Sequence, residues 1–196
     1  MNYVSEILVS LVGIVVAISV HEFGHAYSAH LLGDDTANYN GRMSLNPAKH
    51  IDPIGFIALL FLKIGWAKPV PVNPNNYKNY RVGSIIVSLS GALGNLLAAI
   101  VCGFIATHSN MYAIYTIAIQ AMWYNIWFAA FNLLPIPPLD GWGVISALLP
   151  YKYSEFIYKY ENIGYVVLLI SIFTGVYSIF TRPITILFYN IVSIFF

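Results

Sequence analysis

Charged residues are scarce in this sequence. Asp, Glu, Lys and Arg together make up 9% of the 196 residues, whereas a typical soluble domain contains roughly 25%. Hydrophobic residues account for 59% of the chain, and the mean hydropathy is +0.72. These few charges do not cover a water-exposed globule, so we expect a polytopic membrane protein surrounded by a lipid bilayer. The formal net charge of +1 provides no basic surface, and we expect no nucleic-acid partner.

Cysteine is almost absent as well. Cys102 is the only one in the sequence, which excludes an intrachain disulfide and a cluster of thiolates around zinc. A metal site in this chain would therefore have to use its five histidines and eight acidic residues.

One motif with defined chemistry lies inside the first apolar run, which starts near Val4. It reads His21-Glu22-Phe23-Gly24-His25. On a helix the two histidines are four residues apart on one face, where both imidazoles reach a single metal ion. Glu22 is then placed to take a proton from a water molecule at the metal. The alternative is a pair of core histidines beside a neutralised Glu22, which is disfavoured because unpaired polar groups are costly in an apolar segment.

Apolar runs predict the helices. Four are long enough to cross the bilayer, and they cover residues 4–33, 83–106, 111–134 and 162–180. The last of these runs is interrupted by Arg182-Pro183. Residues 51–65 and 184–196 are shorter than the roughly 20 residues needed to span, so we expect short, re-entrant or interfacial helices there. A further short helix is expected at 142–149, stopped by Pro150.

The predicted fold is an all-α polytopic bundle of about four to six transmembrane or re-entrant helices. Short extended or β segments are expected in the cytoplasmic-side loops: a strand over Tyr39–Leu45, and an extended loop over 66–82 with three prolines. We expect one membrane-embedded domain, 1–196, with a core over about 5–150 and C-terminal helices over 162–196. Small residues on one helical face let a second helix approach closely, and they are Gly91, Gly94, Asn95, Ala98 and Cys102.

Lys and Arg predict the orientation. Residues 34–82 hold six of them, whereas residues 1–20 and 106–112 hold none, and Lys152 and Lys159 follow the third run. If both basic stretches are cytoplasmic, the N-terminus is outside. A multi-pass protein of the cell membrane is then expected, with the histidine motif and Asp140 both toward the cytoplasmic side.

Asp140 is the candidate for a third metal ligand. A catalytic zinc usually has three protein ligands and an open position, but no Glu occurs between Glu22 and Glu155. Asp34 and Asp35 lie roughly 14 Å beyond His25 along a helix, too far for a shared ion. Asp140 follows the third run in a proline-broken segment, where a carboxylate at membrane depth needs a partner. A cap or turn carboxylate before Gly141 is the alternative.

These motifs resemble the site-2 protease family of intramembrane zinc metalloproteases. The likeness covers roughly residues 15–150 and is carried by His21-Glu22-x-x-His25, by Asn132-Leu133-Leu134-Pro135 and by Leu139-Asp140-Gly141. The compact members without a PDZ domain also have a linker similar to Ser44-Leu45-Asn46-Pro47 with His50-Ile51-Asp52-Pro53. The resemblance implies Zn²⁺ held by His21, His25 and Asp140, with Glu22 as general base. It also implies regulated cleavage of a transmembrane protein substrate near the cytoplasmic side.

The sequence departs from the family at two places. The family's Gly-Pro-x-x-Asn is Gly91-Ala92-Leu93-Gly94-Asn95 here, without the proline. The usual Asp-Gly-Gly-Arg is Asp140-Gly141-Trp142-Gly143, without the arginine. Neither change removes a ligand, but both bear on fine positioning and substrate choice.

Several alternatives stay open at the level of sequence. Asn95 is expected either to bind the substrate backbone or the oxyanion, or to make an interhelical hydrogen bond. His50 and Asp52 either gate or support the site, or simply start a helix. An unwound substrate is expected to pair with the strand at 39–45 or with Ala67–Val72. The rival functions are a zinc-binding membrane transporter or channel and a catalytically inactive membrane scaffold.

Overall fold

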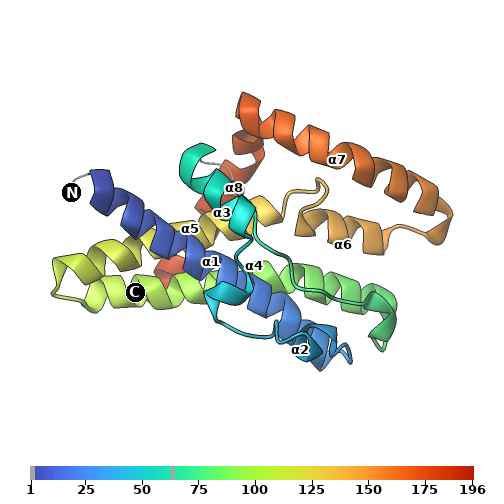
Figure 1. Cartoon of the computed structure of the whole chain (residues 1–196), viewed down its shortest axis with the longest axis horizontal. Coiled ribbons are helices and arrows are strands. Elements are labelled where there is room, and N and C mark those ends of the chain that lie inside the picture. Colours follow the sequence, from blue (N-terminus) through green and yellow to red (C-terminus); the bar gives the residue numbers. More distant parts are fainter. Residues whose placement is uncertain (1–2, 63–64) are drawn as a thin grey trace.

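The computed structural model describes residues 3–62 and 65–196, and the regular elements of these residues are all helices (Figure 1). The α-helices are α1 (Tyr3–Leu31), α2 (Thr36–Tyr39), α3 (Pro53–Leu62), α4 (Tyr80–His108), α5 (Tyr112–Asn132), α6 (Asp140–Leu148), α7 (Ser154–Thr174) and α8 (Tyr177–Val192). Short 3₁₀ turns are η1 (Pro47–Lys49), η2 (Pro74–Asn76), η3 (Tyr151–Tyr153) and η4 (Ser193–Phe195). The predicted all-α class is confirmed.

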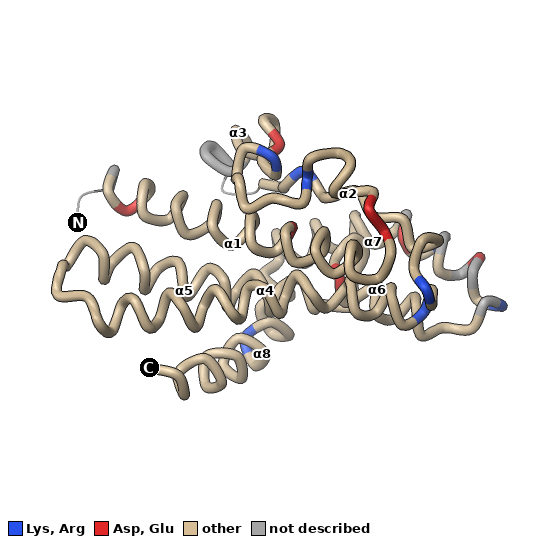
Figure 2. Tube along the Cα trace, turned by 90° about the horizontal axis from the view of Figure 1, so that it is seen from below, with Lys and Arg blue, Asp and Glu red and all other residues tan. Residues whose placement is uncertain are grey.

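The core of the fold is a bundle of α1, α4 and α5. Helices α4 and α5 form a long antiparallel hairpin, and α1 packs on both of them (Figures 1 and 2). The hairpin buries Ala99 against Met122 and Ile126, and Val192 from the chain's end closes this cluster. The close approach depends on small residues of α4, as predicted, although the buried stripe is not the expected one. Its small and polar members are Gly83, Gly91, Ala92, Asn95, Ala99, Gly103 and Ala106, and Gly94, Ala98 and Cys102 of the predicted face are not among them.

The C-terminal helices differ from the prediction. The expected helix over 162–180 is wrong, because α7 ends at Thr174 and Gly175 follows with φ +74°. Glycine adopts this left-handed conformation without strain and commonly ends helices. Pro183, expected to interrupt the chain, lies inside α8. A proline within a membrane helix is tolerated where neighbouring groups satisfy the freed carbonyl.

The segment between α1 and α4 also corrects a prediction. The described residues contain no β-strand, so the strand expected over Tyr39–Leu45 is wrong, and its first residue ends the short helix α2. An isolated antiparallel bridge joins Ile51 to Ala67, and the chain from Ala67 to Val72 has no helical structure. The short helix expected over 51–65 is α3, although residues 63 and 64 lie outside the described residues.

Asp34 ties this segment to the end of α1. Its carboxylate accepts hydrogen bonds from the Asn73 and Thr36 backbone N–H groups, the Thr36 hydroxyl and the Asn76 amide. Burial alone would raise the pKa of Asp34, but these donors stabilise the charged form and hold the pKa below its usual value. The loop that follows Val72 is therefore anchored beside the C-terminal end of α1.

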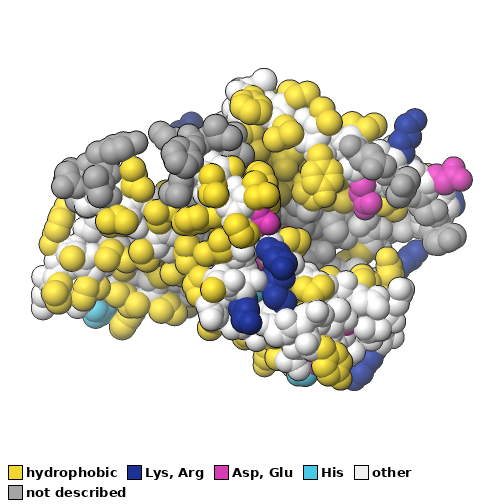
Figure 3. All heavy atoms as spheres, in the orientation of Figure 1, with side chains coloured by type: hydrophobic (Ala, Val, Ile, Leu, Met, Phe, Trp, Pro, Cys, Tyr) yellow, Lys and Arg dark blue, Asp and Glu magenta, His cyan; other side chains and the backbone are white. Residues whose placement is uncertain are grey.

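Three helices in the described residues are long and apolar enough to cross a membrane: Ser5–Leu31, Tyr80–His108 and Tyr177–Phe195. Hydrophobic side chains dominate the left half of Figure 3, over the first half of α1. Figure 2 shows most Lys, Arg, Asp and Glu toward the other end, around α2, the end of α1 and the loop before α4. Most of the charged residues thus lie away from the first half of α1.

Candidate metal centre

The histidine motif lies in the second half of α1, on the face that packs against α4. His21, Glu22 and His25 are 3%, 8% and 9% exposed. The helical spacing brings the two Nε2 atoms to 3.0 Å from each other. At a rise of about 1.5 Å per residue, His21 lies roughly 15 Å from the C-terminal end of α1. The motif is therefore buried at depth in a candidate membrane span.

Asp140 approaches this pair from a segment more than 100 residues further along the sequence. It is the first residue of α6, directly after the proline-rich turn that follows α5. Its Oδ2 atom lies 3.0 Å from His21 Nε2 and 3.3 Å from His25 Nε2. Gly141 permits this placement, because a Cβ atom there would collide with the Leu133 and Leu134 carbonyl oxygens. The turn therefore folds back tightly enough to put the carboxylate between the two rings.

Hydrogen bonds at the far side of each ring define which nitrogens face Asp140. His25 Nδ1 lies 2.7 Å from the Val87 carbonyl oxygen, which only accepts, so Nδ1 carries the proton. His21 Nδ1 lies 2.7 Å from Asn95 Oδ1, and the Asn95 amide nitrogen donates elsewhere, so His21 Nδ1 also donates. In neutral rings both Nε2 atoms then present lone pairs. Accordingly, Asp140 Oδ2 is buried and has no hydrogen-bond donor.

A zinc ion fits this arrangement of acceptors. The two Nε2 atoms and Asp140 Oδ2 converge with no proton between them. Their lone pairs repel one another unless a cation lies among them. Tetrahedral zinc with bonds of about 2.0–2.1 Å places its ligand atoms about 3.3–3.4 Å apart. The three separations here are 3.0, 3.0 and 3.3 Å. His21, His25 and Asp140 form a group able to hold a metal ion, and no other is found in the described residues.

Glycines at the α1–α4 crossing make room for the imidazoles. A Cβ atom on Gly91 would lie 2.6 Å from His21 Cε1 and from His25 Nε2. A Cβ atom on Gly24 would lie 2.6 Å from the Ser90 carbonyl oxygen. Both contacts are closer than side chains tolerate, so the helices approach here only because these residues lack a side chain. The glycine of the family's Gly-Pro-x-x-Asn pattern therefore has a steric purpose that the missing proline does not affect.

Asn95 lies behind His21 and is fully buried. Its Oδ1 accepts from His21 Nδ1, and its Nδ2 donates to the Ala17 carbonyl and to Asn125 Oδ1, each at 2.8 Å. Asn125 in turn donates to the Ala121 carbonyl. All of these partners are protein groups on α1 and α5. The geometry is that of an interhelical hydrogen bond, which was one of the two alternatives for Asn95.

We expect Asn95→Leu to weaken zinc binding by about 10–100-fold, because the ring loses the partner that fixes its tautomer and orientation. Zinc affinity is measured by competition with a chromophoric chelator. Asn190→Leu, a change of the same kind on α8, is the control and should leave the affinity unchanged. An Asn95→Leu affinity equal to that of the wild type would contradict this role.

Glu22 has a partner that sequence reasoning missed. The Val70 backbone N–H donates to Glu22 Oε2 at 2.7 Å, across 48 residues of sequence. Val87 and Asn125, which contact the site from α4 and α5, were missed as well. Two of these contacts use backbone atoms, which carry no residue-type signal. The polar Asn125 within an apolar run was the one available indication.

The remaining predicted residues lie away from the three acceptors. Asp52 Oδ1 accepts from the Gly55 N–H at 2.7 Å and so starts α3, as one alternative proposed. His50 is fully buried, and its Nε2 bonds to the Ser44 carbonyl oxygen at 2.6 Å. Both therefore shape the loop before α3.

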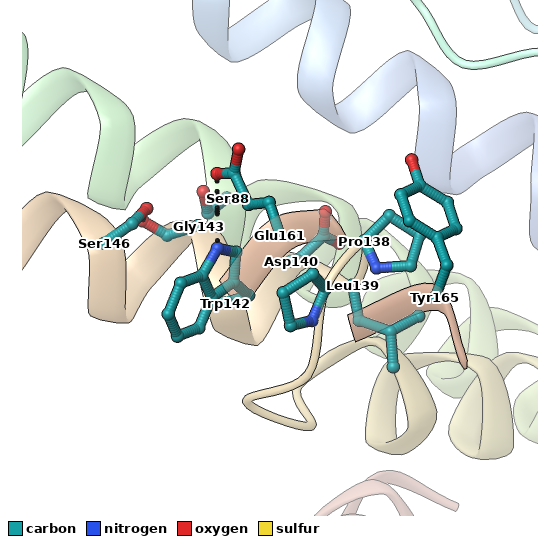
Figure 4. A pocket seen from close by; sticks show the side chains of 10 residues that line it. Ser88, Pro138, Leu139, Asp140, Trp142, Gly143, Ser146, Glu161 and Tyr165 are labelled. Carbon is teal, nitrogen blue, oxygen red and sulfur yellow. Dashed lines mark hydrogen bonds between the residues drawn. The ribbon is translucent and has the colours of Figure 1, made fainter. Parts of the chain in front are cut away.

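A cavity of about 400 Å³ adjoins Asp140 (Figure 4). Its walls come from α4, α6, α7 and the proline-rich turn, and they include Ser88, Ser146, Trp142, Glu161 and Tyr165. Figure 4 shows Trp142 Nε1 bonded to Glu161 Oε1, at 3.3 Å. A second cavity of about 480 Å³ shares Ser88, Ser146 and Glu161 and extends to Val72 and Arg81. The two cavities therefore adjoin each other between Asp140 and the loop before α4.

The comparisons with known proteins are consistent with this centre. "Putative zinc metalloprotease YwhC" of Bacillus subtilis is 35% identical over 183 residues, covering 88% of this chain and 84% of the relative. "Putative zinc metalloprotease Rip2" of Mycolicibacterium smegmatis is 27% identical over 187 residues, covering 89% and 70%. Rip2 of Mycobacterium tuberculosis strain Erdman is 27% identical over 178 residues, covering 80% and 67%.

No family model matches the chain, and no solved structure matches it. The relatives are named for zinc and for proteolysis, and the likeness covers most of both chains. The chain therefore belongs to the family of these relatives, the site-2 protease family.

Proposed function

We propose that the protein is an intramembrane zinc metalloprotease that hydrolyses peptide bonds of membrane-spanning substrates. In this proposal the zinc ligands are His21, His25 and Asp140, and Glu22 is the general base. The observation that carries it is the convergence of two unprotonated imidazole nitrogens and a carboxylate oxygen from segments more than 100 residues apart, within a candidate membrane span. The whole chain, 1–196, acts as one membrane-embedded domain.

Each residue has a distinct task in the reaction. Zinc, when bound, supplies a Lewis acid that polarises the scissile carbonyl and lowers the pKa of water toward about 7. Glu22 follows His21 directly, and one of its oxygens is held by Val70, which leaves the other to accept the proton of the attacking water. The same carboxylic acid then donates this proton to the leaving amine. His21, His25 and Asp140 would hold the ion and would leave it a further position for the water and the substrate.

Substrate and water need separate routes to a buried site. The polar cavity beside Asp140 supports entry of water from the charged loops, because Ser88 and Ser146 offer hydroxyl groups along it. The substrate must be unwound locally, since a helix hides its peptide bonds in its own hydrogen bonds. Of the two segments expected to receive it, the stretch from Ala67 to Val72 is the extended one, and it passes Glu22.

The active site in this proposal opens toward the cytoplasm. The positive-inside rule assigns the Lys- and Arg-bearing loops to the cytoplasmic side, and Figure 2 shows most blue segments beside α2 and α3 and toward the right, away from the N-terminal end of α1. The protein is then a multi-pass protein of the cell membrane with its N-terminus outside. The rival transporter or channel calls for ionisable groups spaced along the spans; those of α4 lie only at its ends, Arg81 and His108.

Metal removal tests the proposal. We expect purified protein in detergent to cleave a quenched-fluorescence single-span peptide, to lose this activity with 1,10-phenanthroline, and to regain it with added Zn²⁺. Fluorescence and mass spectrometry of the products measure cleavage. A non-chelating phenanthroline isomer is the matched control. Cleavage that persists without metal would contradict the proposal, and zinc uptake into proteoliposomes without cleavage of any substrate would favour the rival transporter.

A further inference from the structure

The Glu22 carboxylate is held by the extended segment around Val70. Val70 donates its N–H to Glu22, and its side chain is buried with Ala26, Ala37 and Met43. Pro69 and Pro71 flank it and have no N–H to bond with neighbouring chain. Upstream, the Lys68 N–H donates to the His50 carbonyl at 2.8 Å. The position of the Val70 N–H therefore also depends on the groups that bind the Lys68 and Pro69 carbonyls.

Arg42 fixes those carbonyl groups. Its Nη2 donates to the Lys68 carbonyl at 2.6 Å and to the Pro69 carbonyl at 3.2 Å. Gly41, with φ +64°, makes the turn before Arg42, and the Arg42 N–H donates to the Ala37 carbonyl. The side chain thus reaches the extended stretch from a turn that is itself pinned to α2.

The charge of Arg42 is unusual for its surroundings. The residue is 8% exposed, and its Nε is buried without a hydrogen-bond partner. Among residues 3–62 and 65–196, no carboxylate forms an ion pair with it. A buried guanidinium compensated only by carbonyl dipoles is costly. Stability alone would be served better by an apolar residue, which indicates a role linked to the stretch it holds.

A single peptide group connects Arg42 to Glu22. The Pro69 carbonyl accepts from the guanidinium, and the N–H of the same peptide bond, at Val70, donates to the Glu22 carboxylate. A cation at the carbonyl end polarises the amide and makes its N–H a stronger donor to an anion. We propose that Arg42 is a positioning residue of the protease, which acts through the Pro69–Val70 peptide to hold the Glu22 carboxylate in its working orientation. This inference rests on the proposed function, since it assumes that Glu22 is the base.

The experiment compares kcat and KM of purified full-length variants on the quenched-fluorescence single-span peptide, with zinc content measured in each. Arg42→Ala should lower kcat by about 10–100-fold, the worth of a hydrogen bond to a charged group, with KM and zinc content nearly unchanged. Arg42→Lys should recover part of kcat, because an ammonium still donates to both carbonyls. Lys78→Ala removes a cation from a neighbouring loop and is the control.

Val70→Pro tests the peptide directly, because it deletes the N–H while two flanking prolines already favour an extended chain. It should lower kcat as Arg42→Ala does, and Val70→Ala, which keeps the N–H, should stay at least about ten-fold faster than Val70→Pro. The double variant Arg42→Ala/Val70→Pro should be no slower than the slower single variant, because both changes break one connection. Full kcat in Val70→Pro, or effects that multiply, would overturn the inference. If Arg42→Ala fails to fold, the kcat values of Arg42→Lys and Val70→Pro test the inference in its place.

Amide exchange separates this inference from the proposed function. In ¹⁵N-valine-labelled protein, the Val70 amide should exchange slowly with solvent, and should exchange faster in Arg42→Ala and in Glu22→Ala. This pattern without cleavage of any substrate would support the Arg42–Val70–Glu22 connection while rejecting proteolysis. Rapid exchange of Val70 in the wild type would overturn the connection, whatever cleavage shows.

Discussion

Glu22→Gln is expected to lower the cleavage rate by about 10²–10⁴-fold, the contribution typical of a general base. The amide has nearly the same shape as the carboxylate, and its oxygen still accepts the Val70 N–H. It does not take a proton from water. Because Glu22 is not among the converging acceptors, zinc content should equal that of the wild type. Cleavage of the single-span peptide and metal analysis of the same sample measure the two quantities.

Glu6→Gln provides a matched control, since it makes the same change in the first turn of the same helix. It should leave both cleavage and zinc content unchanged. Retained cleavage in Glu22→Gln would reject Glu22 as the essential base. Loss of zinc together with activity would instead assign Glu22 to the metal's coordination, contrary to the geometry.

Asp140→Asn is expected to weaken zinc binding by more than about 100-fold, because removal of a direct ligand should exceed the 10–100-fold cost of losing its supporting partners. The new amide has a further effect. Its NH₂ group donates to the Nε2 lone pairs that lie 3.0 and 3.3 Å from Oδ2, so it satisfies the imidazoles without a cation. The purified variant should therefore contain little zinc, and chelators should no longer lower its melting temperature, whereas they lower that of the wild type.

Asp52→Asn is the control for this change, because asparagine also caps a helix and α3 should persist. Its zinc content and its response to chelators should match those of the wild type. An Asp140→Asn variant that retains a full equivalent of zinc at wild-type affinity would contradict the assignment of Asp140 as a ligand.

The helices of the core were predictable because each is a long apolar run. The run from Val4 became α1 and the run from 83 became α4, with ends that moved by a few residues. The short helix after Asp52-Pro53 also followed from local signals, a cap and a first-turn proline. Local sequence was sufficient to predict these helices, because an apolar run that enters a bilayer must form a helix to satisfy its backbone hydrogen bonds.

The predictions failed where tertiary contacts decide between local options. Pro183 is a strong breaker in water, yet it lies within α8, and the chain breaks at Gly175 instead. The polar stretch from Tyr39 alternates like a strand but pairs with no neighbouring strand in the described residues. The chemistry of the site was visible in His21, Glu22 and His25, whereas the N–H of Val70 has no side-chain signature. Arg42 gave no sign of its role because its partners are the backbone carbonyls of Lys68 and Pro69.

The central claim is that one zinc ion joins α1 to the start of α6. X-ray absorption at the zinc K edge of the purified, zinc-loaded protein tests it most directly. The account predicts two imidazoles and oxygen donors at about 2.0–2.1 Å, with one imidazole lost in His25→Ala and the ligand set altered in Asp140→Asn. A sulfur ligand at about 2.3 Å, which Cys102 would have to supply, or a ligand set that Asp140→Asn leaves unchanged, would contradict it.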